Sequence, residues 1–270
     1  MRMRRCLILA SFLFICVLPP AGAGEIVDLE VSSSRDEPLR LLGYLTRPAD
    51  RGPFPAVVVL HGCAGFDGHV VAWADRLRGM GYAALALDSL GSRRLRQACA
   101  GGAFDQSGDA YRALDWLAKQ PFVRADRVAL LGFSMGGTAT LLALERDTVA
   151  SRSGAKFRAG LAFYPSCSGA SGIFAVPSLI LIGELDDWTP AAACREMIAG
   201  RSGTGVTRKP GDRSTVDLVL YPGAQHGFDI PALQPMAGVE LLGHRLAYDE
   251  AATIDATRRL REFLQLMSGK

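Results

Sequence analysis

The chain has little net charge and, beyond its first residues, no long hydrophobic run. Its 270 residues include 30 lysines and arginines against 27 aspartates and glutamates, a formal net charge of +3. A protein that binds nucleic acid or an anionic membrane surface needs a clear excess of cations, so this balance argues against both partners. After residue 23 no apolar run approaches the roughly 20 residues that a transmembrane helix needs, so no stable membrane insertion is expected.

The N-terminus is typical of a secretory signal. Three arginines precede an apolar core over residues 7–18, which is shorter than a membrane span, and residues 21–23, Ala-Gly-Ala, form a small-residue cleavage site. We expect residues 1–23 to be removed and the protein to be exported, periplasmic or secreted; an uncleaved anchor is the alternative. Removal leaves 27 basic and 27 acidic residues, and residues 24–270 suit a single α/β domain.

Cysteine is sparse, and its spacing fits no zinc-binding pattern. Beyond the signal segment the cysteines are Cys63, Cys99, Cys167 and Cys194. An even number in an exported chain indicates two disulfides, and four cysteines allow three pairings. We favour Cys63–Cys99 and Cys167–Cys194, because the second pair would join loops that follow neighbouring strands; free thiols are the alternative. No metal or organic cofactor is implied.

Apolar runs alternate with amphipathic stretches along the rest of the chain. Residues 25–33 and 39–46 alternate apolar and polar, as an edge hairpin does. Further strands are predicted over residues 55–60, 83–87, 127–132, 158–163, 178–182 and 215–221. Helices are predicted over residues 70–80, 105–119, 135–146, 190–199 and about 245–266. This alternation predicts a doubly wound, mostly parallel sheet with helices on both faces and a ligand site at the carboxyl ends of its strands.

A serine between two glycines lies at one of these strand ends, in Gly132-Phe133-Ser134-Met135-Gly136. At a strand-to-helix turn this pattern is the nucleophile elbow of α/β-hydrolases. The turn leaves no room for side chains beside the serine, and the new helix points its first N–H groups at the place where an oxyanion would form. Ser134 is therefore the candidate nucleophile.

Histidine is rare, and its four positions leave one candidate base. A serine hydroxyl needs a base to take its proton, and that base needs a carboxylate to orient it. His61 ends a strand, and His69 and His244 precede or lie in predicted helices, whereas His226 lies in the loop after the last strand. We predict His226 as the base; a solvent-exposed loop histidine is the alternative.

The carboxylate is expected from the loop that follows residues 178–182. Asp186 is the first candidate, because the loop has room there to turn back toward the histidine. Asp187 is the second, with a role at a helix N-terminus as its alternative, and Glu184 is expected to be a structural loop residue. The order of serine, aspartate and histidine along the chain is then that of α/β-hydrolases.

Two backbone N–H groups are candidates for an oxyanion hole. Met135, directly after the serine, supplies one, and the small residues of His61-Gly62-Cys63-Ala64-Gly65 make the Cys63 N–H the candidate for the other. Each such donor contributes about 3 kcal/mol to the transition state. His61 is then expected to hold this loop in place; a plain glycine turn is the alternative for the whole segment.

Four aromatic residues near these motifs could line a small acyl or alcohol pocket, with core packing as the alternative for each. They are Phe66, Tyr164, Trp188 and Phe228.

Taken together, the motifs resemble the dienelactone hydrolase family. The resemblance rests on residues 61–65, 132–137, 183–187 and 224–228, with residues 247–252 similar to the family's closing helix. It implies an α/β-hydrolase fold and a hydrolytic reaction. It also implies the roles given above: Ser134 as nucleophile, Asp186 and His226 as its partners, and the N–H groups of Cys63 and Met135 as the oxyanion hole.

The chain departs from the members of that family that open dienelactones. Those members carry cysteine where Ser134 stands and hold the substrate carboxylate with arginines, one of them just after the histidine, whereas residues 227–230 contain none. Arg93, Arg94 and Arg96 lie in a loop that could overhang the site, although a solvated basic loop is the favoured interpretation. We therefore expect an exported serine hydrolase of a small ester or lactone, with dienelactone itself not the expected substrate. A peptidase or amidase on the same fold, or a non-catalytic binding protein, is the alternative.

Overall fold

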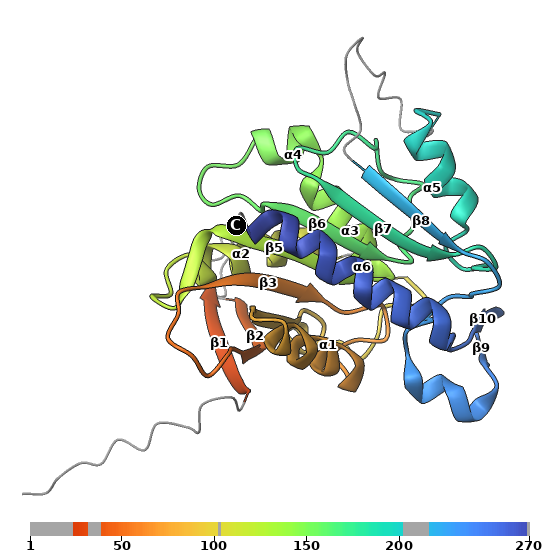
Figure 1. Ribbon diagram of the computed structural model, residues 1–270, viewed down its shortest axis with the longest axis horizontal. Helices are drawn as coiled ribbons and strands as arrows, with labels where there is room; N and C mark the ends of the chain where they lie inside the picture. The colour runs from red at the N-terminus through yellow and green to blue at the C-terminus, as the bar shows by residue number, and fades with distance from the viewer. Residues whose placement is uncertain (1–23, 32–38, 102–103, 202–215, 269–270) are drawn as a thin grey trace, which may run out of the picture.

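An eight-stranded sheet forms the centre of the protein in a computed structural model, which describes residues 24–31, 39–101, 104–201 and 216–268 (Figure 1). The strands are β1 (Glu25–Val31), β2 (Leu39–Thr46), β3 (Phe54–Leu60), β4 (Ala83–Asp88), β5 (Val123–Phe133), β6 (Ala159–Phe163), β7 (Ser178–Gly183) and β8 (Val216–Tyr221). Their order is β1-β2-β4-β3-β5-β6-β7-β8. β1 and β2 form an antiparallel edge hairpin, β2 is antiparallel to β4, and all other neighbours are parallel. The predicted fold class is confirmed.

Helices cover both faces of this sheet. They are α1 (Gly68–Gly79), α2 (Gln106–Leu117), α3 (Met135–Leu144), α4 (Arg146–Ala150), α5 (Ala191–Ile198) and α6 (Glu250–Ser268), with short 3₁₀ turns η1 (Gly91–Arg93) and η2 (Pro231–Met236). α1 and α6 lie on one face, and α2 and α3 lie on the other (Figure 1). Among these helices, none combines the length and the apolar character that crossing a membrane requires.

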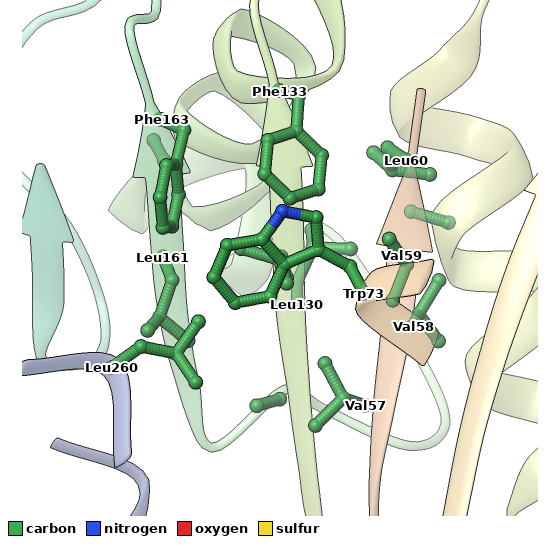
Figure 2. Close-up of a cluster of buried hydrophobic side chains, with 14 of the residues drawn as sticks. Val57, Val58, Val59, Leu60, Trp73, Leu130, Phe133, Leu161, Phe163 and Leu260 are labelled. Atoms are coloured by element: carbon green, nitrogen blue, oxygen red, sulfur yellow. The ribbon is translucent and has the colours of Figure 1, made fainter. Parts of the chain in front are cut away.

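The core forms where the central strands are covered on both sides. Val57, Val58 and Val59 of β3 are completely buried, which explains why their sequence is a continuous apolar run rather than an alternation. Figure 2 shows Trp73 of α1 lying over the face of the sheet between Phe133 and Leu130, and its ring centroid is 5.6 Å from that of Phe133 and 5.1 Å from that of Phe163. This aromatic layer lies directly beneath the carboxyl ends of β5 and β6.

Two predicted helices differ from the structure. The helix predicted over residues 135–146 ends at Leu144, because the Glu145 backbone is extended and pairs with Phe174 before α4 begins. The helix predicted from residue 245 begins at Glu250 instead. The residues before it form a small hairpin of β9 (Val239–Leu241) and β10 (His244–Leu246), which the sequence analysis missed. The predicted signal over residues 1–23, and with it the boundary at residue 24, lies outside the described residues.

Candidate active site

Ser134 lies at a tight turn between β5 and α3. Its backbone has φ 52° and ψ −116°, a conformation that non-glycine residues rarely adopt. A Cβ atom at Gly132 would lie 2.0 Å from the Gly136 oxygen, and one at Gly136 would lie 2.6 Å from the carbonyl oxygens of Leu60 and His61. The turn therefore requires glycine on both sides of the serine, which is the physical basis of the sequence motif.

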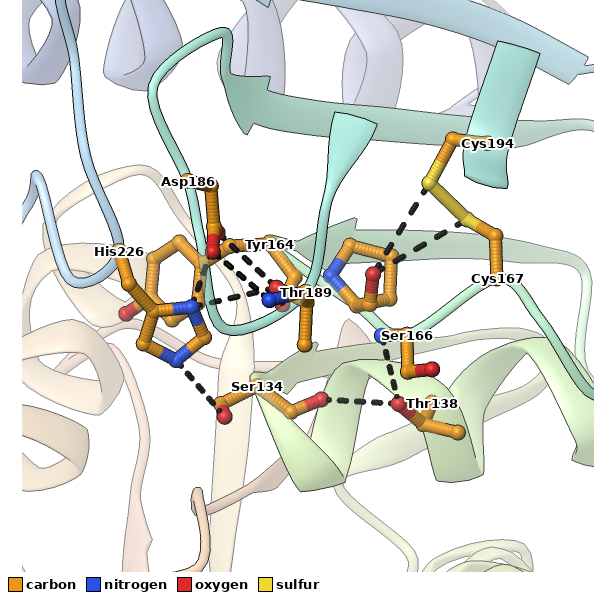
Figure 3. The surroundings of a disulfide bond; sticks show 10 residues. Ser134, Thr138, Tyr164, Ser166, Cys167, Asp186, Thr189, Cys194 and His226 are labelled. Atoms are coloured by element: carbon orange, nitrogen blue, oxygen red, sulfur yellow. Dashed lines mark hydrogen bonds and ion pairs between the residues drawn. A yellow bond between two sulfur atoms is a disulfide. The ribbon is translucent and has the colours of Figure 1, made fainter. Parts of the chain in front are cut away.

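His226 connects this serine to a carboxylate. Its Nε2 atom lies 2.9 Å from the Oγ atom of Ser134, and its Nδ1 atom lies 2.9 Å from Oδ2 of Asp186 (Figure 3). The histidine is 3% exposed and the aspartate 4%, so the contact between these two side chains is shielded from water, whereas Ser134 is half-buried. The structure thus brings together the three side chains singled out from the sequence, drawn from loops after β5, β7 and β8.

The loop after β7 satisfies the remaining acceptor positions of Asp186. Oδ1 accepts hydrogen bonds from the backbone N–H groups of Trp188 at 3.0 Å and Thr189 at 2.8 Å. The Thr189 hydroxyl lies 2.9 Å from Oδ2 and 3.0 Å from the Tyr164 carbonyl oxygen, either of which can accept its proton. A carboxylate held this way keeps one oxygen directed at the histidine. Thr189 was missed from the sequence, although Asp followed three residues later by Thr is a common local hydrogen-bonding pattern.

The other acidic residues of this loop lie elsewhere. The Asp187 carboxylate accepts a hydrogen bond from the Arg245 N–H at 3.2 Å and lies 3.5 Å from Nδ1 of His244. Glu184 pairs with Arg195 at the surface. Neither carboxylate contacts His226, so the geometry favours Asp186 over both.

The loop with Cys63 borders the serine from the other side. A Cβ atom built at Gly62 would lie 3.4 Å from Cβ of Ser134. His61 holds the base of this loop: its Nδ1 donates to the Gly62 oxygen at 2.7 Å, and its Nε2 accepts from the Ser89 N–H at 3.2 Å. Burial lowers the pKa of His61, which favours the neutral ring that this pattern needs.

Both predicted oxyanion donors, the N–H groups of Cys63 and Met135, lack a protein acceptor in the described part of the chain. Cys63 forms a disulfide with Cys99, and its carbonyl oxygen accepts from the Ala98 N–H at 2.8 Å, so the loop is fixed at two points. The predicted pairing is correct, and so is the pairing of Cys167 with Cys194, which joins the loop after β6 to α5 (Figure 3).

Two cavities meet at Ser134. The larger has a volume of about 530 Å³ and the smaller about 80 Å³. Cys63, Cys99, Ser134 and Trp188 line both cavities. Of the remaining site residues, Met135 lines only the large cavity and His226 only the small one. A carbonyl group bound at the serine would therefore have space on two sides.

Of the four aromatic residues predicted to line a pocket, two line the cavities at Ser134 and two do not. Trp188 lines both cavities, and Tyr164 forms part of the small one. The prediction for Phe228 is wrong: the chain turns inward at Gly227, where φ is 70°, and the Phe228 ring is fully buried against Phe163. Phe66 is half-buried against the core and lines neither cavity at the serine.

The arginine loop does not supply a substrate ligand in this structure. Arg93 donates to both oxygens of Asp109, at 2.7 and 2.8 Å, and to the Ser89 carbonyl oxygen at 2.7 Å. Arg94 and Arg96 are exposed to solvent, as the favoured interpretation of this loop requires. Within the ranges described, no cluster of three His, Cys, Asp or Glu side chains could hold a metal ion.

A second buried His–Asp pair lies beneath the small cavity and was missed from the sequence. Asp229 is 1% exposed and accepts hydrogen bonds from Nε2 of His69 at 2.9 Å, Nε1 of Trp73 at 2.7 Å and the Tyr164 hydroxyl at 2.7 Å. These contacts join α1, the end of β6 and the loop that carries His226. The Tyr164 ring also packs edge-on against the His226 ring at 4.7 Å, so the network supports the histidine from below.

The protonation of this pair follows from its surroundings. Burial by itself raises the pKa of Asp229, but the charge of His69 and the hydrogen bonds from His69, Tyr164 and Trp73 outweigh it and lower the pKa. Burial likewise opposes the charged form of His69, yet the charge and hydrogen bond of Asp229 raise its pKa. Burial, with Asp229 adding to it, raises the pKa of Tyr164 well above its ordinary value, so the phenol remains a donor.

The chain resembles known hydrolases in sequence and in fold. Residues 41–268 match the dienelactone hydrolase family. A Bradyrhizobium protein named "Probable 2-oxo-3-(5-oxofuran-2-ylidene)propanoate lactonase" is 28% identical over 228 residues, which are 77% of this chain and 88% of that protein.

Solved structures share the fold at lower identity. A dienelactone hydrolase-like promiscuous phosphotriesterase from metagenomic libraries superposes with a TM-score of 0.66 at 22% identity, over 91% of this chain and 99% of that one. Dienelactone hydrolase from Anabaena variabilis superposes with a TM-score of 0.62 at 20% identity, over 91% of this chain and 98% of that one. At such identities the likeness establishes the fold alone.

Proposed function

Because this chain belongs to the dienelactone hydrolase family and is a carboxylic-ester hydrolase, we propose that it is an exported serine hydrolase that forms an acyl-enzyme on Ser134. The observation that carries this proposal is the continuous chain of contacts from Ser134 through His226 to Asp186, with both distances 2.9 Å. Such a chain can move a proton away from the hydroxyl and stabilise the charge that results.

The proposed reaction proceeds in two acyl transfers. The Ser134 oxygen attacks the carbonyl carbon while its proton passes to Nε2 of His226, and Asp186 stabilises the resulting imidazolium. The oxyanion accepts hydrogen bonds from the N–H groups of Cys63 and Met135. The bond from carbon to the leaving oxygen then breaks, and His226 returns the proton to that oxygen. A water molecule, deprotonated by His226, attacks the acyl-enzyme in the same way, releasing the acid and restoring the serine.

The substrate class is a small ester or a lactone. The name of the Bradyrhizobium relative supports a lactone, and the family as a whole supports ester chemistry. A serine in place of cysteine as nucleophile favours a full general-base mechanism, since a hydroxyl has almost no anionic form at neutral pH. An amide substrate would need the same groups, so the test below includes one.

Export is supported by the two disulfides, which persist in oxidising compartments. The predicted signal over residues 1–23 would direct the chain there. Cell fractionation followed by N-terminal sequencing tests this proposal. A mature chain that begins at or near Gly24 in the exported fraction is the expected result, and a full-length chain retained in the cytoplasm would contradict it.

The proposed nucleophile is tested by replacing one hydroxyl. We expect Ser134→Ala to reduce kcat/KM for ethyl butyrate by at least about 1,000-fold. The rate of hydrolysis is measured as the rate of acid release in a pH-stat. Ser151→Ala is the matched control, because Ser151 lies at the exposed end of α4 and should retain full activity. Equal turnover by Ser134→Ala would reject the proposal, and faster cleavage of N-ethylbutyramide than of the ester would favour the amidase alternative.

A further inference from the structure

The two cavities at Ser134 differ in size by several-fold. The small cavity has a volume of about 80 Å³, well below the range of about 300–1,000 Å³ that is usual for small-molecule sites. The large cavity, at about 530 Å³, lies within that range. A substrate bound at the serine must therefore place its smaller part in one and its larger part in the other.

The positions of His226 and Met135 indicate which cavity receives the leaving group and which receives the acyl group. In the tetrahedral intermediate the leaving oxygen must lie within reach of His226, because it receives its proton from that ring. His226 lines the small cavity and not the large one. The oxyanion is directed at the N–H groups of Cys63 and Met135, so the remaining substituent, the acyl chain, points away from the histidine. That direction leads into the large cavity, whose wall includes Met135, Thr138 and Leu142.

Apolar side chains line much of the small cavity. Leu241 and Leu246 of the β9–β10 hairpin and Ile230 line its outer part, whereas Phe133, Tyr164 and His69 line the inner part. The hairpin is fixed to the site, because the Ala247 N–H donates to the His226 carbonyl oxygen at 3.2 Å and the Arg245 N–H donates to Asp187 at 3.2 Å. The Asp229 network fixes the inner side. The volume available to a leaving group is thus set on both sides by hydrogen-bonded structure.

We propose that the enzyme is selective for esters that join a medium or bulky acyl group to an alcohol of one or two carbons. The acyl group occupies the large cavity, and the methoxy or ethoxy group occupies the small one beside His226. This proposal rests on the proposed function of Ser134 and specifies the substrate class of the same site.

Two homologous series of esters test this assignment. In the acyl series, from ethyl acetate to ethyl octanoate, we expect kcat/KM to rise several-fold as methylenes enter the large cavity. In the alcohol series, from methyl to hexyl butyrate, we expect kcat/KM to fall at least about tenfold beyond the ethyl ester, because the small cavity offers much less space for methylenes than the large one. The opposite pattern, with long alcohols accepted and long acyl chains rejected, would overturn the proposal.

Variants that change the size of each cavity test whether the cavities cause this selectivity. Leu241→Ala enlarges the small cavity and should raise kcat/KM for butyl butyrate at least threefold relative to ethyl butyrate. Leu242→Ala is the control, because Leu242 is 59% exposed, follows Leu241 directly and lines neither cavity. Leu142→Trp should reduce kcat/KM for ethyl octanoate at least tenfold more than it reduces kcat/KM for ethyl acetate, because tryptophan fills part of the large cavity. If Leu142→Trp instead impairs long alcohols, the assignment is reversed and the proposal fails.

The design separates this proposal from the proposed function. Turnover of both series with the same length dependence would reject the size selectivity and leave the serine mechanism intact. Absence of turnover for every ester by the folded wild-type protein would reject both.

Discussion

Ser134, His226 and Asp186 show how few residues the proposed chemistry requires and how much each depends on its neighbours. The serine occupies an unfavourable backbone conformation, for which a cost of about 1–3 kcal/mol is typical. That cost is offset by surrounding packing, in which Gly132 lets β5 approach α3 and Gly136 lets α3 approach the end of β3. The Asp186 carboxylate, in turn, is held by Trp188 and Thr189 of its own loop, so that Oδ2 meets Nδ1 of His226.

If Asp186 and not Asp187 orients His226, the two aspartates should differ strongly in their effect on kcat. Asp186→Asn should reduce kcat for ethyl butyrate by up to about 10,000-fold, because an amide at this position favours the wrong tautomer of His226. Asp187→Asn should lose less than tenfold, since its carboxylate contacts the hairpin and not the histidine. Steady-state kinetics of the two variants side by side decide the assignment, and a larger loss in Asp187→Asn would reverse it.

At the scale of elements, the sequence predicted the strands and the site loops well, because buried parallel strands have continuous apolar runs and the loops carry motifs at their ends. It did not predict the end of α3, where the chain leaves the helix only because Glu145 pairs with Phe174, a distant strand-like partner. It also missed the β9–β10 hairpin. Its two turn residues, Leu242 and Gly243, both have positive φ, as a type I′ turn requires, yet leucine is a rare residue there.

The site residues likewise divide into those that have a local sequence pattern and those that depend on contacts in the fold. Ser134 and His226 lie within local patterns that can be read from sequence. The contact of Thr189 with Asp186 is also local, three residues apart, but it was missed. The His69–Asp229 pair could not be found from local patterns, because the partners of Asp229 come from α1 and the end of β6. Phe228 was misassigned for the related reason that only the fold reveals which side of a loop faces the core.

Because the His69–Asp229 pair joins separate elements, it predicts that the free energy of unfolding depends on pH. A raised pKa means that His69 stabilises the folded state fully below its ordinary pKa of 6.5 and loses that contribution as the pH rises through the folded value. The lowered pKa of Asp229 means that its contribution is present above 3.8 and is lost as the pH falls through its folded value. The stabilisation should therefore be greatest between these limits.

Urea unfolding of the wild type and His69→Gln measures this effect. The glutamine can still donate a hydrogen bond but carries no titrating charge. The free energy of unfolding of the wild type, relative to the variant, should be largest near pH 5–6 and should decrease as the pH rises above 6.5. If the difference in unfolding free energy between wild type and His69→Gln stays constant or grows as the pH rises above 6.5, the pair is not charged in the folded protein.

For the whole molecule, the two disulfides connect peripheral loops to the proposed site. Cys63–Cys99 closes a separation of 36 residues and Cys167–Cys194 one of 27. The first holds the loop that carries a proposed oxyanion donor, and the second holds α5 against the loop after β6. The neighbouring-strand argument supported only the pairing of Cys167 with Cys194, which come after β6 and β7 along the chain; Cys194 lies in α5, the helix that follows β7.

Removal of each disulfide should have separable effects. Each double Cys→Ser variant should lose about 3–4 kcal/mol of unfolding free energy, the chain-entropy value for loops of 36 and 27 residues. Loss of Cys63–Cys99 should also lower kcat for ethyl butyrate, because the Cys63 N–H is no longer held in place, whereas loss of Cys167–Cys194 should affect mainly stability. Denaturant titration and kinetics at a temperature where both variants are folded test this difference. Equal kcat in the two variants would contradict it.

The most direct measurement of the central claim is mass spectrometry of the protein after reaction with a short-chain fluorophosphonate. The account expects one adduct per chain, located by peptide mapping on Ser134, and a strong reduction of labelling when His226 is replaced by glutamine. An adduct on another residue, or no adduct on a folded protein that hydrolyses ethyl butyrate, would contradict it.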